Sequence, residues 1–411
     1  MESTGAETPL AASDQASRVM LAVAAVIGHA AKHLMNSAFF VLLPEIKLGL
    51  GLTNAGVGTI SAVRNIAGGL VNAPAGFAAD RYQSQGATTL GITIILVGIF
   101  TAAMGYVNSL TSAVIVATLG GMAITFWHPA AISALSRRFP ERRGFAISLH
   151  GTGGSIGEAM GPLAVAGLIL LIGWRVVFLS IGIPSVLGGV VVWLLLRRVW
   201  DKQTGSRTTV VSYVGSLRRL VTNRHILIIM VMVMLYGGAQ SALFTFLPIY
   251  IREDVGYSPS VMNLFIAAMQ VTGIFSQPAM GYLSDRYGRK QVLLPGLLGL
   301  TVTTLGISVV PAGVPLFLTI VFMGMFQFPL MSLFLASATD VAGEDVQGTV
   351  VSLVFGATII VAGISPYVGG LLADAYGTAV VFRYGAGLGA LAALVLATQR
   401  WPRAIRATEG N

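Results

Sequence analysis

The chain has 411 residues, of which 55% are hydrophobic and only 10% are charged, and its mean hydropathy is +0.80. Soluble domains carry about 25% charged residues, so this composition excludes an ordinary soluble protein. Cysteine is absent, which excludes disulfides, thiolate nucleophiles and thiolate metal sites. Most of the basic residues behind the net charge of +9 lie in short segments between apolar runs. That pattern is typical of a protein in a lipid bilayer and argues against a nucleic-acid partner.

Apolar runs long enough to cross a bilayer follow one another along nearly the whole chain. The expected fold is an all-α integral membrane protein with twelve transmembrane helices in two six-helix halves. These halves are residues 19–196 and 225–399, joined by a basic cytoplasmic linker at 197–224, and the segments 1–18 and 400–411 are expected to be cytoplasmic tails. The expected spans are about 19–43, 55–78, 87–107, 110–135, 145–172, 175–196, 225–250, 260–283, 291–310, 314–338, 348–373 and 379–399.

The positions of Lys and Arg predict how these spans are oriented. With the N-terminus inside, nineteen of the 25 basic residues lie in inner segments and four lie in outer loops. This excess follows the positive-inside rule and predicts cytoplasmic termini in a multi-pass protein of a bacterial-type inner membrane. The remaining two basic residues, Lys32 and Arg64, lie within spans.

The first span carries a polar face. His29, Lys32, His33 and Asn36 are spaced i, i+3, i+4 and i+7, which places them on one side of a helix. A lysine near the middle of a span costs roughly 2.5–3.5 kcal/mol on insertion scales, so this face should meet water, a partner or a substrate. Two interpretations of Lys32 stay open, namely attraction of an anionic substrate group and pairing with Glu158.

Two further charged residues lie deep within spans of the first half. Arg64 can bind a carboxylate or phosphonate with two parallel hydrogen bonds, or it can neutralise Glu158. Glu158 is the only carboxylate well inside a span, and we expect it to couple proton movement, with a permanent salt bridge as the alternative. His33 and His128 are the histidines most suited to relaying protons, because histidine titrates near physiological pH.

Metal binding is the less favoured interpretation of the histidines. His29 and His33 have the i, i+4 spacing of a ligand pair, but the sequence supplies no cysteine and no carboxylate near them. We therefore expect no metal and no other cofactor, and a metal-dependent intramembrane enzyme is an unfavoured alternative. The second half offers Gln240 and Gln327, which suit either ligand contact or interhelical hydrogen bonds.

The two halves contain a repeated loop sequence. Gly76-Phe-Ala-Ala-Asp80-Arg81-Tyr82 follows the second span, and Gly281-Tyr-Leu-Ser-Asp285-Arg286-Tyr287 follows the eighth. A duplicated six-span unit is typical of transporters that bind their substrate between the halves. Continued through Gly288-Arg289-Lys290, the second copy resembles the loop signature of the major facilitator superfamily. The resemblance implies that these loops gate a conformational change through Asp80, Arg81, Asp285, Arg286 and Arg289.

Two motifs resemble those of particular groups within this superfamily. Gly157-Glu-Ala-Met-Gly161-Pro162 resembles a fifth-span motif of exporters in this superfamily, which implies a gating role for Gly157, Gly161 and Pro162. Phe126-Trp-His128-Pro129, followed by Arg142-Arg-Gly144-Phe-Ala146-Ile-Ser148, is similar to the fosmidomycin-resistance branch. Members of that branch are taken to export an anionic phosphonate antibiotic.

The expected function is therefore secondary active transport of a small organic anion by alternating access, with proton-coupled efflux by a monomeric antiporter. Proton-coupled uptake of a carboxylate nutrient is the alternative. The expected substrate-binding residues are Lys32, Arg64, His33, Asn36, His128, Gln240 and Gln327, and the expected proton-coupling residues are Glu158, His33 and His128.

Overall fold

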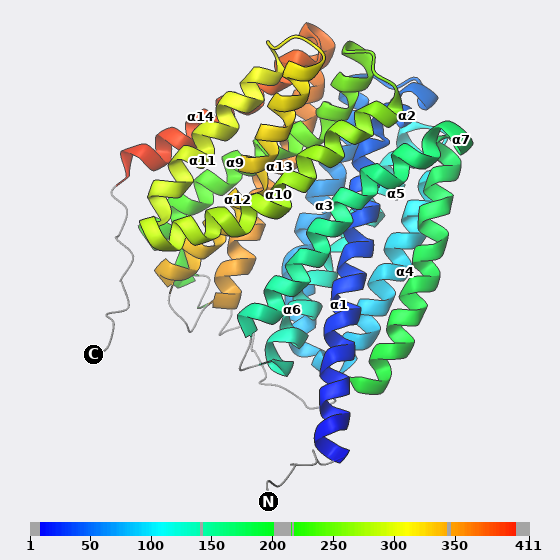
Figure 1. Cartoon of the computed structure of the whole chain (residues 1–411), viewed down its shortest axis with the longest axis vertical. Coiled ribbons are helices and arrows are strands. Elements are labelled where there is room, and N and C mark those ends of the chain that lie inside the picture. The colour runs from blue at the N-terminus through cyan, green and yellow to red at the C-terminus, as the bar shows by residue number, and fades with distance from the viewer. Residues whose placement is uncertain (1–8, 140–142, 201–214, 216–217, 343–346, 400–411) are drawn as a thin grey trace, which may run out of the picture.

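The computed structural model describes residues 9–139, 143–200, 215, 218–342 and 347–399, and within these ranges it contains helices and no strands (Figure 1). The helices are α1 (Pro9–Val41), α2 (Leu43–Leu50), α3 (Asn54–Arg81), α4 (Gly86–Met104), α5 (Leu110–Thr125), α6 (Trp127–Arg138), α7 (Arg143–Val199), α9 (Arg224–Ile249), α10 (Pro259–Tyr287), α11 (Arg289–Ile307), α12 (Val314–Ala342), α13 (Gln347–Tyr376) and α14 (Ala379–Thr398), with a short 3₁₀ turn η1 (Gln83–Gln85) and a π-helical turn η3 (Tyr250–Asp254).

Local sequence explains where several helices begin and end. Thr53 caps α3 by accepting a hydrogen bond from the backbone N–H of Gly56, and Asn223 caps α9 in the same way. Ser109 and its partner Ser112 form a reciprocal capping box at the start of α5. Gly51 ends α2 in the left-handed conformation, with φ of 62°, which glycine adopts without steric cost.

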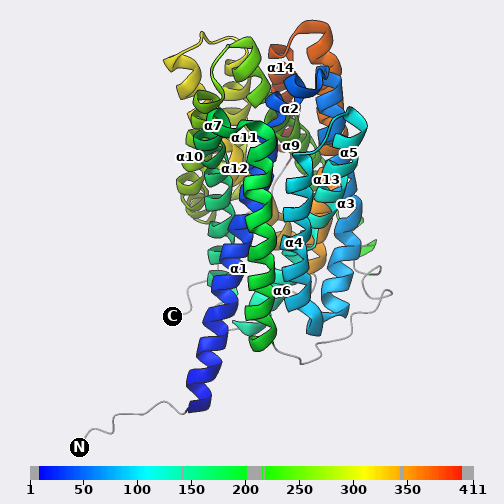
Figure 2. The ribbon, with the colours of Figure 1, turned by 90° about the vertical axis from the view of Figure 1, so that its right-hand side faces the viewer.

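Ten helices in the described ranges are long and apolar enough to cross a membrane, which confirms an all-α membrane protein. One of them, α7, contains two arms that turn back on each other at Gly173, where φ is 71° and ψ is 162°. Figure 2 shows the second arm of α7 beside α4. Helix α3 has 28 residues, but Arg64 and three asparagines lower its hydropathy, and it is not among the ten.

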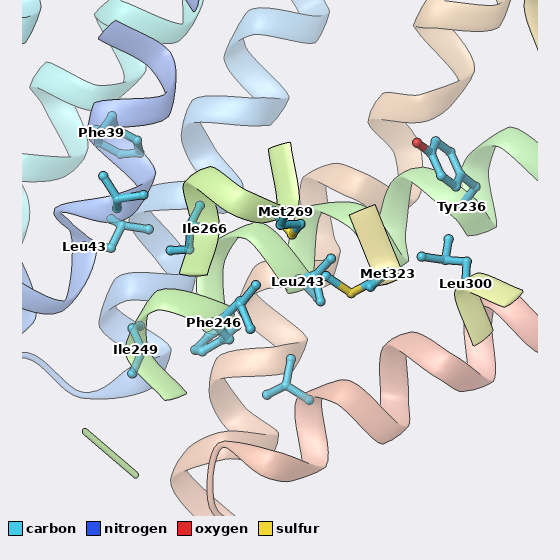
Figure 3. Close-up of a cluster of buried hydrophobic side chains, with 14 of the residues drawn as sticks. Phe39, Leu43, Tyr236, Leu243, Phe246, Ile249, Ile266, Met269, Leu300 and Met323 are labelled. Carbon is cyan, nitrogen blue, oxygen red and sulfur yellow. The ribbon is translucent and has the colours of Figure 1, made fainter. Parts of the chain in front are cut away.

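The two halves meet along two pairs of helices. Helix α3 packs along α13, and α7 packs along α10. Gly58 allows the first contact to be close, because a Cβ there would overlap the carbonyl oxygen of Pro366. Figure 3 shows Phe39 and Leu43 of the first half in one apolar cluster with Ile266 of the second half. A separate cluster, which includes Trp127, belongs to the first half alone.

Polar contacts join the halves at the α2 end of the molecule, opposite to the start of α1 (Figure 1). Arg252 Nε donates to Glu45 Oε1 at 2.9 Å, and Lys47 forms an ion pair with Glu253. The carboxylate of Asp374 on α13 accepts the first two backbone N–H groups of α3, each at 2.9 Å. Such a cap satisfies orphan donors and complements the helix dipole, so it ties α13 to the start of α3.

Glycines bring α7 against the backbone of α1. Gly153, Gly157 and Gly161 lie one turn apart on the face of α7 that meets α1. A Cβ on Gly157 would overlap the carbonyl oxygen of Ala30, and a Cβ on Gly161 would lie 2.8 Å from that of Leu34. Small residues of this kind let membrane helices approach closely, so this stripe fixes the distance between α1 and α7.

The variant Gly157→Ala is expected to lower the thermal midpoint of the purified protein, because forced overpacking costs about 1–3 kcal/mol. The matched control is Gly167→Ala on the same helix, where no heavy atom lies within 4 Å of the added methyl. That control should be neutral or slightly stabilising, since alanine favours a helix over glycine by about 1 kcal/mol. Equal midpoints for the two variants, measured by thermal unfolding in detergent, would contradict the packing role of Gly157.

Candidate functional site

The polar face of α1 meets α6 and α7 in the interior of the first half. His29 and Lys32 are only 4% and 2% exposed. His128 comes from α6 and Glu158 from α7, so three separate helices supply the cluster. The i, i+3, i+4, i+7 spacing therefore correctly predicted a shared face, and the structure brings Lys32, His33, His128 and Glu158 together on it.

Glu158 pairs with a histidine rather than with a lysine or arginine. His33 Nδ1 donates to Glu158 Oε1 at 2.8 Å. Lys32 Nζ lies instead 3.2 Å from His128 Nε2 and 3.4 Å from His128 Nδ1. No carboxylate of the described residues forms an ion pair with Lys32, so the pairing of Lys32 with Glu158 is not the arrangement found here.

The histidines form a continuous cluster. His29 Nδ1 donates to the backbone carbonyl of His150 at 2.7 Å, and the two rings stack with centroids 3.8 Å apart. His29 Nε2 lies 3.0 Å from His128 Nε2 and 3.1 Å from His33 Nε2. The Nε2 atoms of His33 and His128 therefore both approach that of His29.

Arg64 lies beside this cluster, against Asn36 and two aromatic rings. Its Nη2 donates to Asn36 Oδ1 at 2.6 Å, and its guanidinium lies 4.8 Å from the ring centre of Phe39 and 5.3 Å from that of Phe40. The side chain is 9% exposed. Among the residues that the structure describes, none supplies Arg64 with a carboxylate within ion-pair distance. Cation–π contact and one amide thus take the place of a counter-ion.

Two small cavities adjoin these residues. One of about 40 Å³ lies between the halves and is lined by Glu158 and Asn36 from the first half and by Phe244 and Gln270 from the second. The other, of about 30 Å³, is lined by Arg64 and Asn36. Asn36 borders both cavities, and each has room for water.

Ser37 and Gln270 belong to the site, although the sequence did not distinguish them. Gln270 Nε2 on α10 donates to Ser37 Oγ at 3.1 Å, and Ser37 Oγ donates to the backbone carbonyl of Glu158 at 2.9 Å. The Oε1 atom of Gln270 is buried without a hydrogen-bond partner. Ser37 follows His33 by four residues, so the helical periodicity of the polar face contained the signal for it.

Gln240 and Gln327 lie apart from the charged cluster. Both surround Tyr236, whose hydroxyl donates to the backbone carbonyl of Gln327 at 2.5 Å and accepts from Gln240 Nε2 at 3.2 Å. Neither glutamine lines the two cavities. The geometry is that of interhelical hydrogen bonds, and contact of these glutamines with a substrate stays a prediction.

The second copy of the repeated loop forms an ion-pair network. Arg289 binds Asp285 at 2.5 Å and Asp340 at 2.7 Å, which connects α11 with α10 and α12. Arg286 lies against the ring of Tyr287. In the first copy, Arg81 is exposed at the end of α3, and the side chain of Asp80 lies outside the described part of the structure. Of the predicted gating residues, Gly157, Gly161 and Pro162 lie in α7, where the two glycines pack against α1.

Comparison with known proteins assigns the chain to a family. The sequence profile of the Major Facilitator Superfamily matches residues 25–258 and 229–409. The chain is 23% identical over 362 residues to the fosmidomycin resistance protein of Escherichia coli, covering 87% of each chain. It is 25% identical over 372 residues to a probable sulfoacetate transporter of Cupriavidus necator, covering 82% of this chain and 83% of that one.

A solved structure shows the same fold. It is the inward-facing, unoccupied form of a bacterial homologue of the human lysosomal transporter Spinster, with a TM-score of 0.79 and 16% identity, covering 97% of this chain and 100% of that chain. The expected family resemblance is therefore confirmed, and the metal-dependent enzyme is set aside. The chain belongs to the Major Facilitator Superfamily and is a multi-pass membrane transporter of bacterial type, not an enzyme.

Proposed function

We propose that this transporter exports a small organic anion in exchange for protons, by alternating access. The observation that supports this proposal most strongly is the buried guanidinium of Arg64, which has no carboxylate partner among the described residues. Buried charges are stable when they are paired. The first half holds two deep cations, Lys32 and Arg64, whereas its one deep carboxylate, Glu158, is bound by His33. An anionic substrate would supply the missing negative charge.

The surroundings of Arg64 suit a ligand with an anionic head and an apolar body. The bond to Asn36 uses one guanidinium N–H, and the others can bind a carboxylate, phosphonate or sulfonate. The rings of Phe40 and Phe244, 6.3 Å apart, come from opposite halves and can flank the apolar body. In the cavity between the halves, Gln270 has an unpartnered Oε1 that can accept a hydrogen bond from a donor group of the ligand. The relatives named for fosmidomycin and sulfoacetate support a small polar ligand, and sulfoacetate is itself an organic anion.

The topology that we propose has twelve spans with both termini in the cytoplasm. Counting the two arms of α7 separately and adding α3 brings the ten candidate spans to twelve. The positive-inside rule then places the α2 end outside. Contacts such as the ion pair of Glu45 with Arg252 close that end, and they would have to break when the transporter opens outward. The fold likeness to an inward-facing transporter supports this assignment. We propose that the transporting unit is a monomer.

Proton coupling would act through the pair of Glu158 and His33. Glu158 lines the cavity between the halves, so a proton can reach it from there. Protonation of Glu158 would weaken its hold on His33 and change the charge next to Lys32, which lies beside His128. Because Ser37 links the backbone at Glu158 to Gln270 of the second half, this change lies at the boundary that alternating access must rearrange.

The variant Arg64→Gln is expected to weaken anion binding by at least about tenfold, because a charged hydrogen bond is worth about 1.5–3 kcal/mol. The measurement is the shift of the thermal midpoint of purified protein across a panel of anions that includes fosmidomycin and sulfoacetate. Arg383→Gln is the control, since Arg383 is exposed on α14. An anion that stabilises wild type and Arg64→Gln equally would refute recognition by Arg64.

The variant Glu158→Gln is expected to abolish flux driven by an imposed proton gradient in liposomes, because the amide cannot release a proton. Lys32→Ala should slow flux at least about tenfold, since it removes one of the two deep cations. A chelator in all buffers excludes effects of trace metals. Wild-type flux in both variants would overturn the two roles. Gradient-driven accumulation on the side that receives the protons, rather than on the opposite side, would favour the alternative of carboxylate uptake.

A further inference from the structure

The hydrogen bonds of His29 and His33 aim two lone pairs at each other. His29 Nδ1 faces a backbone carbonyl, which only accepts, so Nδ1 carries the proton and Nε2 of the neutral ring carries a lone pair. His33 Nδ1 faces the carboxylate of Glu158, and the same reasoning applies when Glu158 is ionised. The two Nε2 atoms are 3.1 Å apart. Two lone pairs at this distance repel each other unless a cation lies between them.

A third imidazole approaches the same point. His128 Nε2 lies 3.0 Å from His29 Nε2, and the ligand atoms of the three histidines all lie within 4.8 Å of one another. A Zn²⁺ ion binds imidazole nitrogen at about 2.0–2.1 Å, so ligands in a tetrahedral site are roughly 3.3–3.4 Å apart. The nitrogens of His33 and His128 need to move away from His29 Nε2 by only a few tenths of an ångström, whereas the two of them, which lie up to 4.8 Å apart, must come closer together to reach that spacing.

We propose that His29, His33 and His128 form a binding site for one divalent transition-metal ion, with Nε2 of each ring as ligand. Three imidazoles favour ions of intermediate softness such as Zn²⁺, Co²⁺ and Ni²⁺ over Mg²⁺ and Ca²⁺. Two of the three rings already make the second hydrogen bond that is typical of metal-bound histidine. His29 Nδ1 donates to the backbone carbonyl of His150, and His33 Nδ1 donates to the carboxylate of Glu158. The ion would bridge α1 and α6.

The cavity between the halves and the charge of Lys32 determine how a metal ion could enter the site. Glu158 lines the cavity between the halves and touches His33, so an ion in that cavity is one side chain away from the ligands. The ammonium group of Lys32 opposes entry, since Nζ lies 3.2 Å from His128 Nε2. Metal binding therefore requires the ammonium group of Lys32 to turn away from His128. This requirement predicts an unusual result, namely that removing the lysine charge strengthens metal binding.

The test is an equilibrium titration of chelator-stripped, tag-free full-length protein with Co²⁺, followed by its visible ligand-field absorption and by displacement with Zn²⁺. Wild type should bind one equivalent, and His33→Gln or His128→Gln should weaken binding by more than about a hundredfold. His225→Gln is the matched control and should bind like wild type, because His225 lies at the start of α9, outside the cluster. Lys32→Met should bind at least about tenfold more tightly than wild type.

Binding of Co²⁺ can be measured without transport and without knowledge of the substrate. Absence of stoichiometric Co²⁺ binding to wild type would overturn it, as would undiminished binding to His33→Gln and His128→Gln. Metal-free thermal midpoints of the histidine variants show whether loss of binding reflects misfolding. If they are misfolded, Lys32→Met decides, because weaker or unchanged binding in that variant would contradict the site.

Discussion

The structure depends on two buried cations that form no ion pair with a carboxylate of the described residues. Lys32 and Arg64 lie deep in the first half, where Glu158 is the one carboxylate that the sequence places well inside a span, and His33 already binds Glu158. Insertion of such cations is costly, so the fold supplies partial substitutes for a counter-ion. These are the amide oxygen of Asn36 and the aromatic faces beside Arg64. These contacts stabilise the charge of Arg64 in the empty protein, and we propose that an anionic substrate completes the charge balance.

The site and the closed end of the molecule share one stretch of chain. Helix α1 carries the polar face and the residues beside Arg64, and α2 begins directly after it at Leu43. Glu45 and Lys47 on α2 hold the second half by ion pairs. Asn36, the hydrogen-bond partner of Arg64, therefore lies about three helical turns from the contacts that join the halves at the α2 end. The glycine stripe of α7 keeps α1 in place against Glu158.

Periodicity and composition predicted the class of fold and the polar face of α1 that forms one side of the site. The spacing of His29, Lys32 and His33 predicted their common face, because helical geometry is local. The partner of Glu158 was not predictable, since His33 and Lys32 are neighbours on one face of α1 and differences of a few ångströms decide which one binds. Contacts between segments far apart in sequence, such as Glu45 with Arg252, leave no periodic signal. Helix α3 is not among the ten helices apolar enough to cross a membrane, because Arg64 lowers its mean hydropathy.

If the guanidinium of Arg64 binds the anionic substrate, a carboxylate introduced by the variant Asn36→Asp should take the place of that substrate. Asn36 Oδ1 already accepts from Arg64 at 2.6 Å, so a carboxylate at this position would provide the missing counter-ion within the chain. We expect Asn36→Asp to have a higher thermal midpoint than wild type without ligand, and to lose the stabilisation by anions that wild type shows. Asn36→Ala, which adds no charge, should lower the midpoint. A lower thermal midpoint for Asn36→Asp, together with unchanged stabilisation by anions, would show that Arg64 does not bind the anion.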